Sequence, residues 1–409
     1  MVKEEKVMNV AMCIPTYNRA NVVEDTLGRG IEGYAKMGID LYYYDGSDND
    51  ETKKVVEKYI NKGYSNIKYM SFKDDTNRTA MFFSGGGLDK EYEYIWPVKD
   101  RVWFEEPTLR AVEKAMEEGF DAIFLGVLWS YAHPGIGTKT YEKPEEFYFD
   151  WGYLVTSIDV NIFRFESMLK GLTYDELLCY SYAFMHFEIM FKQLSQEHKI
   201  VRSLVGEDIV AYNSRLVSSC QKKENLTIWE DDWIDVNEKL PGCYNEYKAE
   251  VIKHAGSLPW IFGTVDSLIG FKNCGALVPD KLDSILKNWE RVSDIPKEKV
   301  IAIANGTYDK RHDLDLVPRH MDEFLNLLIQ MAEFIRAGKM KKEQIPYDDV
   351  FQGIMNKIIK KNNEDSGIIN VTAGSVEDTL IYIRDKAKTT EEISKAFQIL
   401  ITITITALN

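Results

Sequence analysis

The sequence predicts an α/β protein: a mainly parallel sheet flanked by helices, followed by a mostly α-helical C-terminal domain. Over the first ~130 residues, apolar β-rich runs alternate with amphipathic helical runs, which is typical of a parallel sheet covered by helices. At 409 residues the chain is long for a single core, so two domains are expected. After Ser219 the residue pattern changes to a polar stretch followed by mostly helical segments. We therefore place the domain boundary near residue 220, giving domains 1–220 and 221–409.

Five short apolar runs of the first domain are expected to be strands: Val7–Ile14, Ile39–Tyr44, Asn66–Phe72, Tyr92–Val98 and Phe120–Trp129. Helical periodicity fills the gaps between them: Ala20–Lys36, Glu51–Lys62, Thr76–Leu88 and Glu105–Glu118. Because ligands of such sheets bind beyond the carboxyl ends of the strands, the loops after Ile14, Tyr44 and Val98 should converge on one cleft.

The middle of the chain is less regular. An aromatic, irregular stretch is expected over Tyr131–Ser157, followed by two helices and two strands: Asp159–Lys170, Ala183–Glu197, Ile200–Val205 and Asp208–Tyr212. The polar stretch Gln221–Pro241 is expected to wrap back over the first domain. Helices should then run to the end, including Val317–Ala337 and Ile345–Lys361, in a domain that serves acceptor binding or self-association. The final Ile399–Thr406 alternates at strand period but could equally continue a helix.

Bulk properties restrict the class of protein. A formal net charge of −15 argues against a wide nucleic-acid surface, because a phosphate backbone favours a basic face. The charged start of the chain does not resemble a signal peptide, and no uninterrupted apolar run is long enough to span a bilayer. Five scattered cysteines favour a reducing compartment. We therefore expect a cytoplasmic protein, and leave peripheral membrane association and a homo-oligomer open.

The first motif is Ile14-Pro15-Thr16-Tyr17-Asn18-Arg19, at the end of a buried strand. Pro15 and Asn18 turn the chain out of the sheet, which leaves the ring of Tyr17 at the strand's carboxyl end. A flat aromatic side chain there can stack on a nucleobase. The alternative is an ordinary strand-to-helix turn with Asn18 as the N-cap.

The second motif, Tyr43-Tyr44-Asp45-Gly46-Ser47-Asp48-Asn49-Asp50, also follows a strand directly. The Asp45 carboxylate can accept a hydrogen bond from an imide N–H, which uracil has and cytosine lacks. Gly46 permits a tight turn and close approach of a ligand. Alone, the motif is more simply an acidic turn that caps the helix from Glu51.

Together the two motifs closely resemble those of the family 2 glycosyltransferases of GT-A fold, in which the first loop is typically P-x-Y-N and the second D-D-G-S-x-D. The resemblance extends from about Val7 to about Tyr212, half of the chain. It implies an inverting enzyme that uses a nucleotide-sugar donor, most often a UDP-sugar, and a glycan, polymer or glycoprotein acceptor. It implies neither a particular sugar nor a linkage.

Carried over by position, Pro15, Thr16 and Tyr17 fall on the family's base-binding loop, and Asp45 falls where its acid hydrogen-bonds uracil. Tyr44 replaces the preceding acid of the usual pair. Arg78 falls where many members keep a basic residue beside the nucleotide, and a surface ion pair with Asp74 or Asp75 is an equal alternative.

The family's metal motif should follow the strand that ends at Val98. Here Asp100 is the only acid in that turn, flanked by Lys99 and Arg101. One carboxylate with diphosphate oxygens and water can hold Mg²⁺ or Mn²⁺, so Asp100 is the predicted metal ligand. Lys99 and Arg101 could instead neutralise the phosphate charge themselves, and Lys99 is counted among the nucleotide-binding residues.

The resemblance places the catalytic base near the start of a late helix, where His186 occupies the family's acid position and Glu188 follows. We predict His186 as the base, because Glu188 should form an exposed i,i+4 pair with Lys192. A core histidine bonded to a carbonyl is an equal alternative. Asp150 and Trp151, in the preceding aromatic loop, are the candidate acceptor-binding residues. A different class of function also fits an incomplete metal motif: an inactive scaffold that binds a partner enzyme. A nucleotidyltransferase is a third alternative, disfavoured because the first strand lacks a glycine-rich, basic loop.

Overall fold

The computed structural model describes residues 8–308, apart from 73–75, 128–135, 197, 207, 215, 217–224 and 259–260. The predicted helices and the terminal Ile/Thr stretch beyond residue 308 lie outside the described residues. Within the described part, the chain divides into two compact units. Unit 1 comprises the described residues of 8–127, 136–218 and 232–251, and unit 2 comprises those of 219–231 and 252–308. After residues 219–231 of unit 2, the chain returns to unit 1 at Asp232. The predicted domain boundary near residue 220 stays a prediction.

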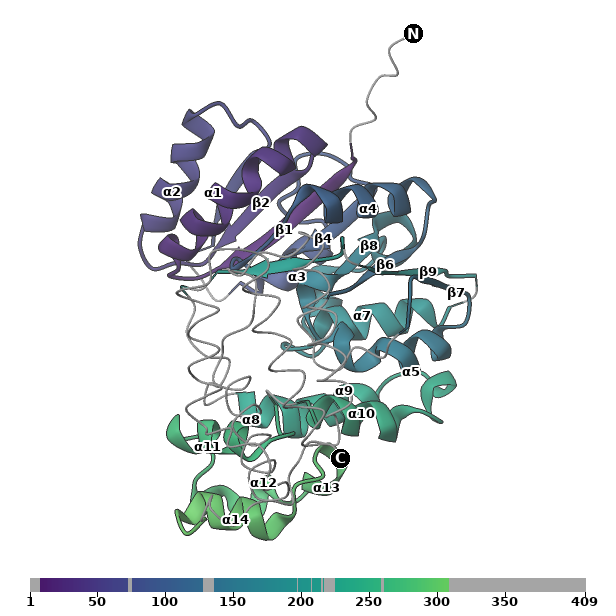
Figure 1. Ribbon diagram of the computed structural model, residues 1–409. Helices are drawn as coiled ribbons and strands as arrows, with labels where there is room; N and C mark the ends of the chain where they lie inside the picture. The colour runs from purple at the N-terminus through teal and green to yellow at the C-terminus, as the bar shows by residue number, and fades with distance from the viewer. Residues whose placement is uncertain are drawn as a thin grey trace, which may run out of the picture. The chain divides into compact units, whose positions relative to one another are not determined.

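Unit 1 is built on an eight-stranded sheet in the order β3-β2-β1-β4-β8-β6-β9-β7 (Figure 1). Its strands are β1 Val10–Thr16, β2 Asp40–Asp45, β3 Ile67–Ser71, β4 Tyr94–Pro97, β6 Ala122–Gly126, β7 Lys139–Tyr141, β8 Asn161–Arg164 and β9 Val201–Val205. Strands β3, β2, β1 and β4 are parallel, as are β6 and β9, whereas β8 and β7 run antiparallel to their neighbours. The predicted α/β class with a mainly parallel sheet flanked by helices is therefore confirmed.

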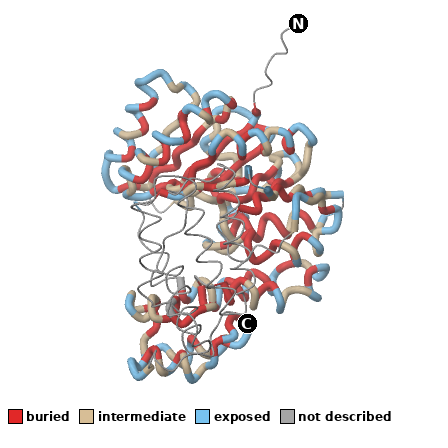
Figure 2. Tube along the Cα trace, in the orientation of Figure 1, coloured by how far each residue is buried: buried red, intermediate tan, exposed pale blue. Residues whose placement is uncertain are grey.

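Helices cover this sheet on both sides. In Figure 1, α1 (Ala20–Met37), α2 (Glu51–Asn61) and α4 (Glu106–Glu117) lie on one side, and α3 (Arg78–Phe83), α5 (Pro144–Val155) and α7 (Met185–Leu194) on the other. The strands of the sheet are mostly buried, while the exposed residues follow the outer faces of the helices and the loops (Figure 2). The amphipathic spacing of the sequence produces this division, because every third or fourth residue of a helix faces the sheet.

Three segments correct the predictions. Asp159–Lys170, expected to be a helix, contains a short 3₁₀ turn Ile158–Val160, strand β8 and a π-helical turn Phe165–Leu169. Strand β8 is inserted between β4 and β6, and its residues Asn161, Ile162 and Phe163 are fully buried. Hydrogen bonds to two neighbouring strands therefore outweigh its local helical pattern. The aromatic stretch expected to be irregular contains β7 and helix α5. A small second sheet pairs β5 (Val102–Phe104) with β10 (Ala211–Asn213).

The segment Asp232–Val251 completes the core of unit 1 with aromatic side chains. Helix α9 (Trp233–Glu238) buries Trp233 against Phe184 and Phe187, with ring centroids 5.1 and 4.7 Å apart. Further along, the Tyr244 hydroxyl donates to the carbonyl oxygen of Phe191 at 2.8 Å. Of the predicted wrapping segment Gln221–Pro241, the part from Asp232 on therefore packs within unit 1. Residues 221–224 lie outside the described residues, and wrapping by the part before Asp232 stays a prediction.

The described part of unit 2 is helical. It contains α8 (Asn225–Thr227), most of the π-helical turn Ile228–Asp232, part of α10 (Lys248–Gly256), α11 (Val265–Asn273), α12 (Leu282–Ile285), α13 (Trp289–Val292) and α14 (Lys297–Asn305). Its core gathers around Phe262, whose ring lies 5.0 Å from that of Trp289 and 5.7 Å from that of Phe271. None of the helices in the described ranges combines the length and apolar character that a membrane span requires.

Candidate nucleotide-binding edge of the sheet

The loops after β1 and β2 are joined side by side at the carboxyl edge of the sheet. Thr16 and Asp45 are partners in the parallel register, and the Gly46 N–H donates to the Thr16 carbonyl at 3.0 Å. Asn18 adopts a left-handed conformation with φ 53°, which asparagine tolerates better than most residues. Its backbone N–H donates to the Ser47 hydroxyl and its side-chain amide to the Asp48 carboxylate, both at 2.8 Å. Asn18 therefore joins the two motifs and does not act as the helix N-cap.

Tyr17 extends from this junction with half of its surface exposed. Its hydroxyl donates to the Asp48 carboxylate at 2.8 Å. This hydrogen bond raises the pKa of Tyr17. The pKa of Asp48 is lowered by the hydrogen bond from Asn18 and, to a smaller extent, by that from Tyr17. The ring is thus oriented by its hydroxyl while much of its surface stays open, as a stacking platform requires.

Asp45 lies at the other extreme, with 1% of its surface exposed. One carboxylate oxygen accepts from the backbone N–H of Ser47 at 2.9 Å and from its hydroxyl, and the other accepts from the Tyr69 hydroxyl at 2.7 Å. Burial, followed by this bond to Asp45, raises the pKa of Tyr69. A carboxylate offers about four acceptor directions, so one remains for an imide N–H. The Asp45 side chain is fixed, and a uracil must approach it closely to make contact.

Arg78, the first residue of α3, lies against the second loop. A Cβ atom added to Gly46 would lie 1.9 Å from a guanidinium nitrogen of Arg78, so a larger residue here would displace the Arg78 side chain. Arg78 also lowers the pKa of Tyr17 electrostatically, although the hydrogen bond to Asp48 outweighs it. The alternative partners, Asp74 and Asp75, lie outside the described residues. Arg78 is therefore brought to the same edge as Tyr17 and Gly46.

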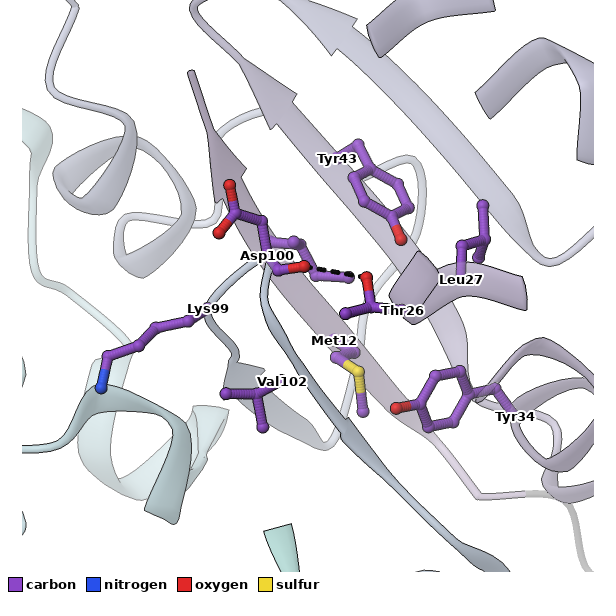
Figure 3. Close-up of a pocket in the computed structure, with 9 residues that line it drawn as sticks. Met12, Thr26, Leu27, Tyr34, Tyr43, Lys99, Asp100 and Val102 are labelled. Carbon is purple, nitrogen blue, oxygen red and sulfur yellow. Dashed lines mark hydrogen bonds between the residues drawn. The ribbon is translucent and has the colours of Figure 1, made fainter. Parts of the chain in front are cut away.

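Asp100 is a buried partner of the first loop. Its two carboxylate oxygens accept from the Thr16 hydroxyl at 2.9 Å and from the Arg19 guanidinium at 3.1 Å. Its carbonyl oxygen accepts from the Thr26 hydroxyl of α1 at 2.8 Å, the dashed line in Figure 3. Pro15, half-buried and in register with Tyr44, lies within the strand. Thr16 and Pro15 thus shape the loop, and Thr16 points to Asp100.

Lys99 and Asp100 diverge, although they are adjacent in sequence (Figure 3). The Lys99 ammonium lies 2.7 Å from the carboxylate of Asp159 and donates to the Ser157 hydroxyl at 2.7 Å. Burial alone would raise the pKa of Asp159, but the charge and hydrogen bond of Lys99 outweigh it and the pKa falls below its ordinary value. Strand β8 runs antiparallel to β4, which brings its first residues to this same edge. The cavity that Lys99 and Asp100 line measures about 10 Å³, too small for more than one water molecule.

As a divalent-cation site, this edge does not fit. Among the described residues, no three His, Cys, Asp or Glu side chains form a group that could hold a metal ion. Asp100, the predicted ligand, is 4% exposed at its side chain and already paired with Arg19. The neighbouring position that could supply a second acid is Lys99, a cation. Mg²⁺ and Mn²⁺ require accessible anionic oxygens, and beside Asp100 the accessible groups are the cations Arg19 and Lys99. The exposed carboxylate of the second loop, Asp48, is hydrogen-bonded to Tyr17 and Asn18.

His186, the predicted base, is buried between α7 and the end of α5. Its Nε2 lies 3.0 Å from the carbonyl oxygen of Thr156, which can only accept, so Nε2 carries the proton. Burial lowers the pKa of His186 to about 4. The last carbonyls of a helix have no partner within it, and His186 and Asn161 donate to those at the end of α5. This geometry matches the alternative of a carbonyl-bonded core histidine, and the base role stays a prediction.

Glu188 forms the expected i,i+4 pair with Lys192, at 2.6 Å, but the expectation of an exposed pair is wrong. The Glu188 side chain is 3% exposed and also accepts from the backbone N–H of Ser181 at 2.9 Å. Helix α7 is buried from Met185 to Phe191, and Glu188 is buried with it. Glu188 thereby holds the loop before α7, and a catalytic role for it remains untested.

The two candidate acceptor residues lie on helix α5 and not on a loop. Trp151 is fully buried against Phe124, and its indole N–H donates to the Tyr141 hydroxyl at 2.8 Å. Asp150 accepts from the same hydroxyl at 2.8 Å and lies 3.4 Å from Lys139. Trp151 presents no surface to an acceptor in this conformation. Asp150 is partly exposed, so its proposed role is compatible with its position.

The sequence missed Arg19, Ser157 and Asp159, which the fold brings to the edge. Arg19 directly follows the first motif and could have been noticed there as a cation at a strand end. Ser157 and Asp159 carried no signal, because Ser157 was expected to end an irregular stretch and Asp159 to begin a helix, and neither was expected to meet β4. Only the insertion of β8 beside β4 places them near Lys99.

No family model matches the chain, and no curated protein matches it. Among solved structures it is similar to S. aureus TarS 1-349, with 13% identity, a TM-score of 0.42, and coverage of 73% of this chain and 91% of that one. The same protein in complex with UDP is 14% identical, with a TM-score of 0.41 and coverage of 73% of this chain and 91% of that one. The mannosyltransferase PcManGT from Pyrobaculum calidifontis, in complex with GDP-Man and Mn²⁺, is 13% identical, with a TM-score of 0.41 and coverage of 75% of this chain and 88% of that one. These identities and TM-scores are too low to assign a function to the chain.

Proposed function

We propose that the protein is an inverting glycosyltransferase that transfers a sugar from a nucleotide-sugar donor, a UDP-sugar, to a hydroxyl group of a glycan, polymer or glycoprotein. The observation that carries this proposal is the joining of the two motif loops at the carboxyl edge of a parallel sheet. An oriented and half-exposed aromatic ring, a fixed buried carboxylate and a nearby guanidinium are supplied there by Tyr17, Asp45 and Arg78. These groups suit the stacking face, the imide N–H and the phosphates of a uridine diphosphate.

Sugar transfer requires two further chemical roles. A base must remove the acceptor proton, and positive charge must stabilise the diphosphate as it leaves. For the second role the edge offers Arg19 and Lys99, both about one-third exposed at their side chains. For the first role His186 and Glu188 remain the residues proposed from the resemblance, although both are buried and hydrogen-bonded.

The nucleotide assignment can be tested by calorimetry. UDP should bind more tightly than CDP or GDP, and Asp45→Asn should remove most of the preference over CDP, because an amide cannot present two acceptor oxygens. Asp89→Asn is a matched control: it alters a carboxylate that is hydrogen-bonded to Tyr42 and that lies outside the two loops. Equal affinity for the three diphosphates would contradict the uracil assignment.

An inactive nucleotide-binding scaffold is the second candidate, and the burial of both proposed bases favours it. A panel of UDP-sugars separates the two functions. Slow hydrolysis or transfer of one sugar supports the enzyme. Tight UDP binding without any turnover, with and without added acceptor glycans, supports the scaffold.

A further inference from the structure

Two ion pairs at the carboxyl edge share an orientation: in each, the cation is accessible and the anion is not. The Arg19 side chain is 34% exposed and its partner Asp100 4%. The Lys99 side chain is 33% exposed and its partner Asp159 0%. A dissolved ion that approaches these two pairs therefore meets a guanidinium and an ammonium group, and the carboxylates of Asp100 and Asp159 lie behind them.

The buried carboxylates hold these cations in place. Removing one partner of a buried pair leaves an uncompensated charge, so neither cation can leave its carboxylate without a large penalty. Within the described residues, Asp159 Oδ2 is buried and has no hydrogen-bond partner, so this carboxylate depends on the contacts that Lys99 and Ser157 make with Oδ1. The Trp96 indole N–H fixes the Asp159 backbone by donating to its carbonyl at 2.9 Å. Lys99 is thus a preorganised cation and not a freely moving surface lysine.

The two pairs come from adjacent places on the edge. Arg19 follows β1, and Lys99 follows β4, which is the parallel neighbour of β1. Helix α1 begins directly after Arg19, has no acidic residue in its first turn and no side-chain cap on its first N–H groups. The positive end of its dipole adds to the field of the two cations.

The geometry points to a metal-independent diphosphate subsite, in which Arg19 and Lys99 carry the charge and Asp100 and Asp159 act as positioning residues behind them. The inference rests on the proposed function only for the identity of the nucleotide; the anion subsite follows from the two ion pairs. Guanidinium and ammonium groups form strong charge-assisted hydrogen bonds to phosphate oxygens. Asp100 is then the counter-ion that orients Arg19, and not a metal ligand.

The test is calorimetric binding of inorganic pyrophosphate, UDP and uridine to the full chain in excess EDTA, and again with Mg²⁺ or Mn²⁺. Pyrophosphate and UDP should bind in EDTA. Lys99→Gln and Arg19→Gln should each weaken both ligands by on the order of ten-fold, the size of one lost charge-assisted contact, and leave uridine unchanged. Lys170→Gln is a matched control, since it removes a charge from an exposed pair with Glu166 beyond the other end of β8. Unfolding curves of each variant establish that it is folded.

Asp100→Asn distinguishes the two roles of that residue by the sign of its effect. The asparagine side-chain oxygen can still accept from Arg19, so removal of the negative charge should leave pyrophosphate and UDP affinity equal or higher, both in EDTA and with added Mg²⁺ or Mn²⁺. Loss of a metal ligand would lower the affinity only in the presence of the divalent cation. The inference is overturned if pyrophosphate binds only when a divalent cation is added, or if Asp100→Asn weakens it ten-fold only in the presence of that cation. If pyrophosphate behaves as expected but UDP binds no more tightly than pyrophosphate, the anion subsite stands and the proposed nucleotide function fails.

Discussion

His186 makes the stability of this protein depend on pH in a predictable direction. Burial holds its pKa at about 4 in the folded chain, against 6.5 for an unperturbed histidine. The unfolded chain therefore takes up this proton first as the pH falls, and folding loses stability through the window from about 6.5 down to about 4. Above 6.5 both states are neutral at this position and the contribution is constant.

The size of the effect follows from the shift. A difference of roughly 2.5 pKa units at about 1.4 kcal/mol per unit gives a loss of about 3.5 kcal/mol once the pH has fallen well below 4. At pH 5.5 about 1.4 kcal/mol should already be lost relative to pH 7.5. Denaturant unfolding at several pH values measures this change in the free energy of unfolding.

His186→Gln isolates the contribution. The glutamine amide can still donate to the Thr156 carbonyl but does not titrate, so the variant should lose less stability than the wild type between pH 6.5 and 4. Carboxylates that titrate in the same window are common to both proteins and cancel in the difference.

One result would refute this reasoning, and the same variant also tests the base role. Identical pH slopes for the wild type and His186→Gln would mean that His186 is not held neutral by burial. A folded His186→Gln protein whose turnover falls by about 10²–10⁴ would establish the base role that the sequence predicts. Near-normal turnover would leave His186 as the group that satisfies a helix-end carbonyl.

Two other substitutions test the core and the nucleotide loop. Trp233→Ala should destabilise the protein by about 3–5 kcal/mol, because it removes a fully buried indole from between Phe184 and Phe187, and Tyr182→Ala, at a side chain 79% exposed, should change the free energy of unfolding little. A small effect of Trp233→Ala in denaturant unfolding would mean that Asp232–Val251 does not complete the core of unit 1. Tyr17→Ala should weaken UDP by about 1–3 kcal/mol in calorimetry, and Tyr17→Phe, which keeps the ring but loses the bond to Asp48, should weaken it less. Equal losses in the two variants would place the importance of Tyr17 in its hydroxyl and not in stacking.

The sequence by itself determined the parallel part of the sheet and the position of its two motif loops. Alternating apolar and amphipathic runs specify β1, α1, β2 and α2 to within a few residues, because each follows from its own spacing of side chains. The turn residues Pro15 and Asn18 place a loop at the end of β1, and Gly46 does so at the end of β2. Each of these signals depends only on residues that are neighbours in the sequence, so the sequence alone is sufficient to predict these elements.

What only the tertiary structure decided depends on partners that are distant in the chain. Strand β8 exists because β4 and β6 offer hydrogen bonds on both of its sides, although its own residues have a helical pattern. Its insertion brings Asp159 to Lys99, and the fold of the first loop brings Arg19 to Asp100. The charge that faces an incoming ligand is set by which member of each pair is buried. Burial is a property of the packed chain, and so is the low pKa of His186.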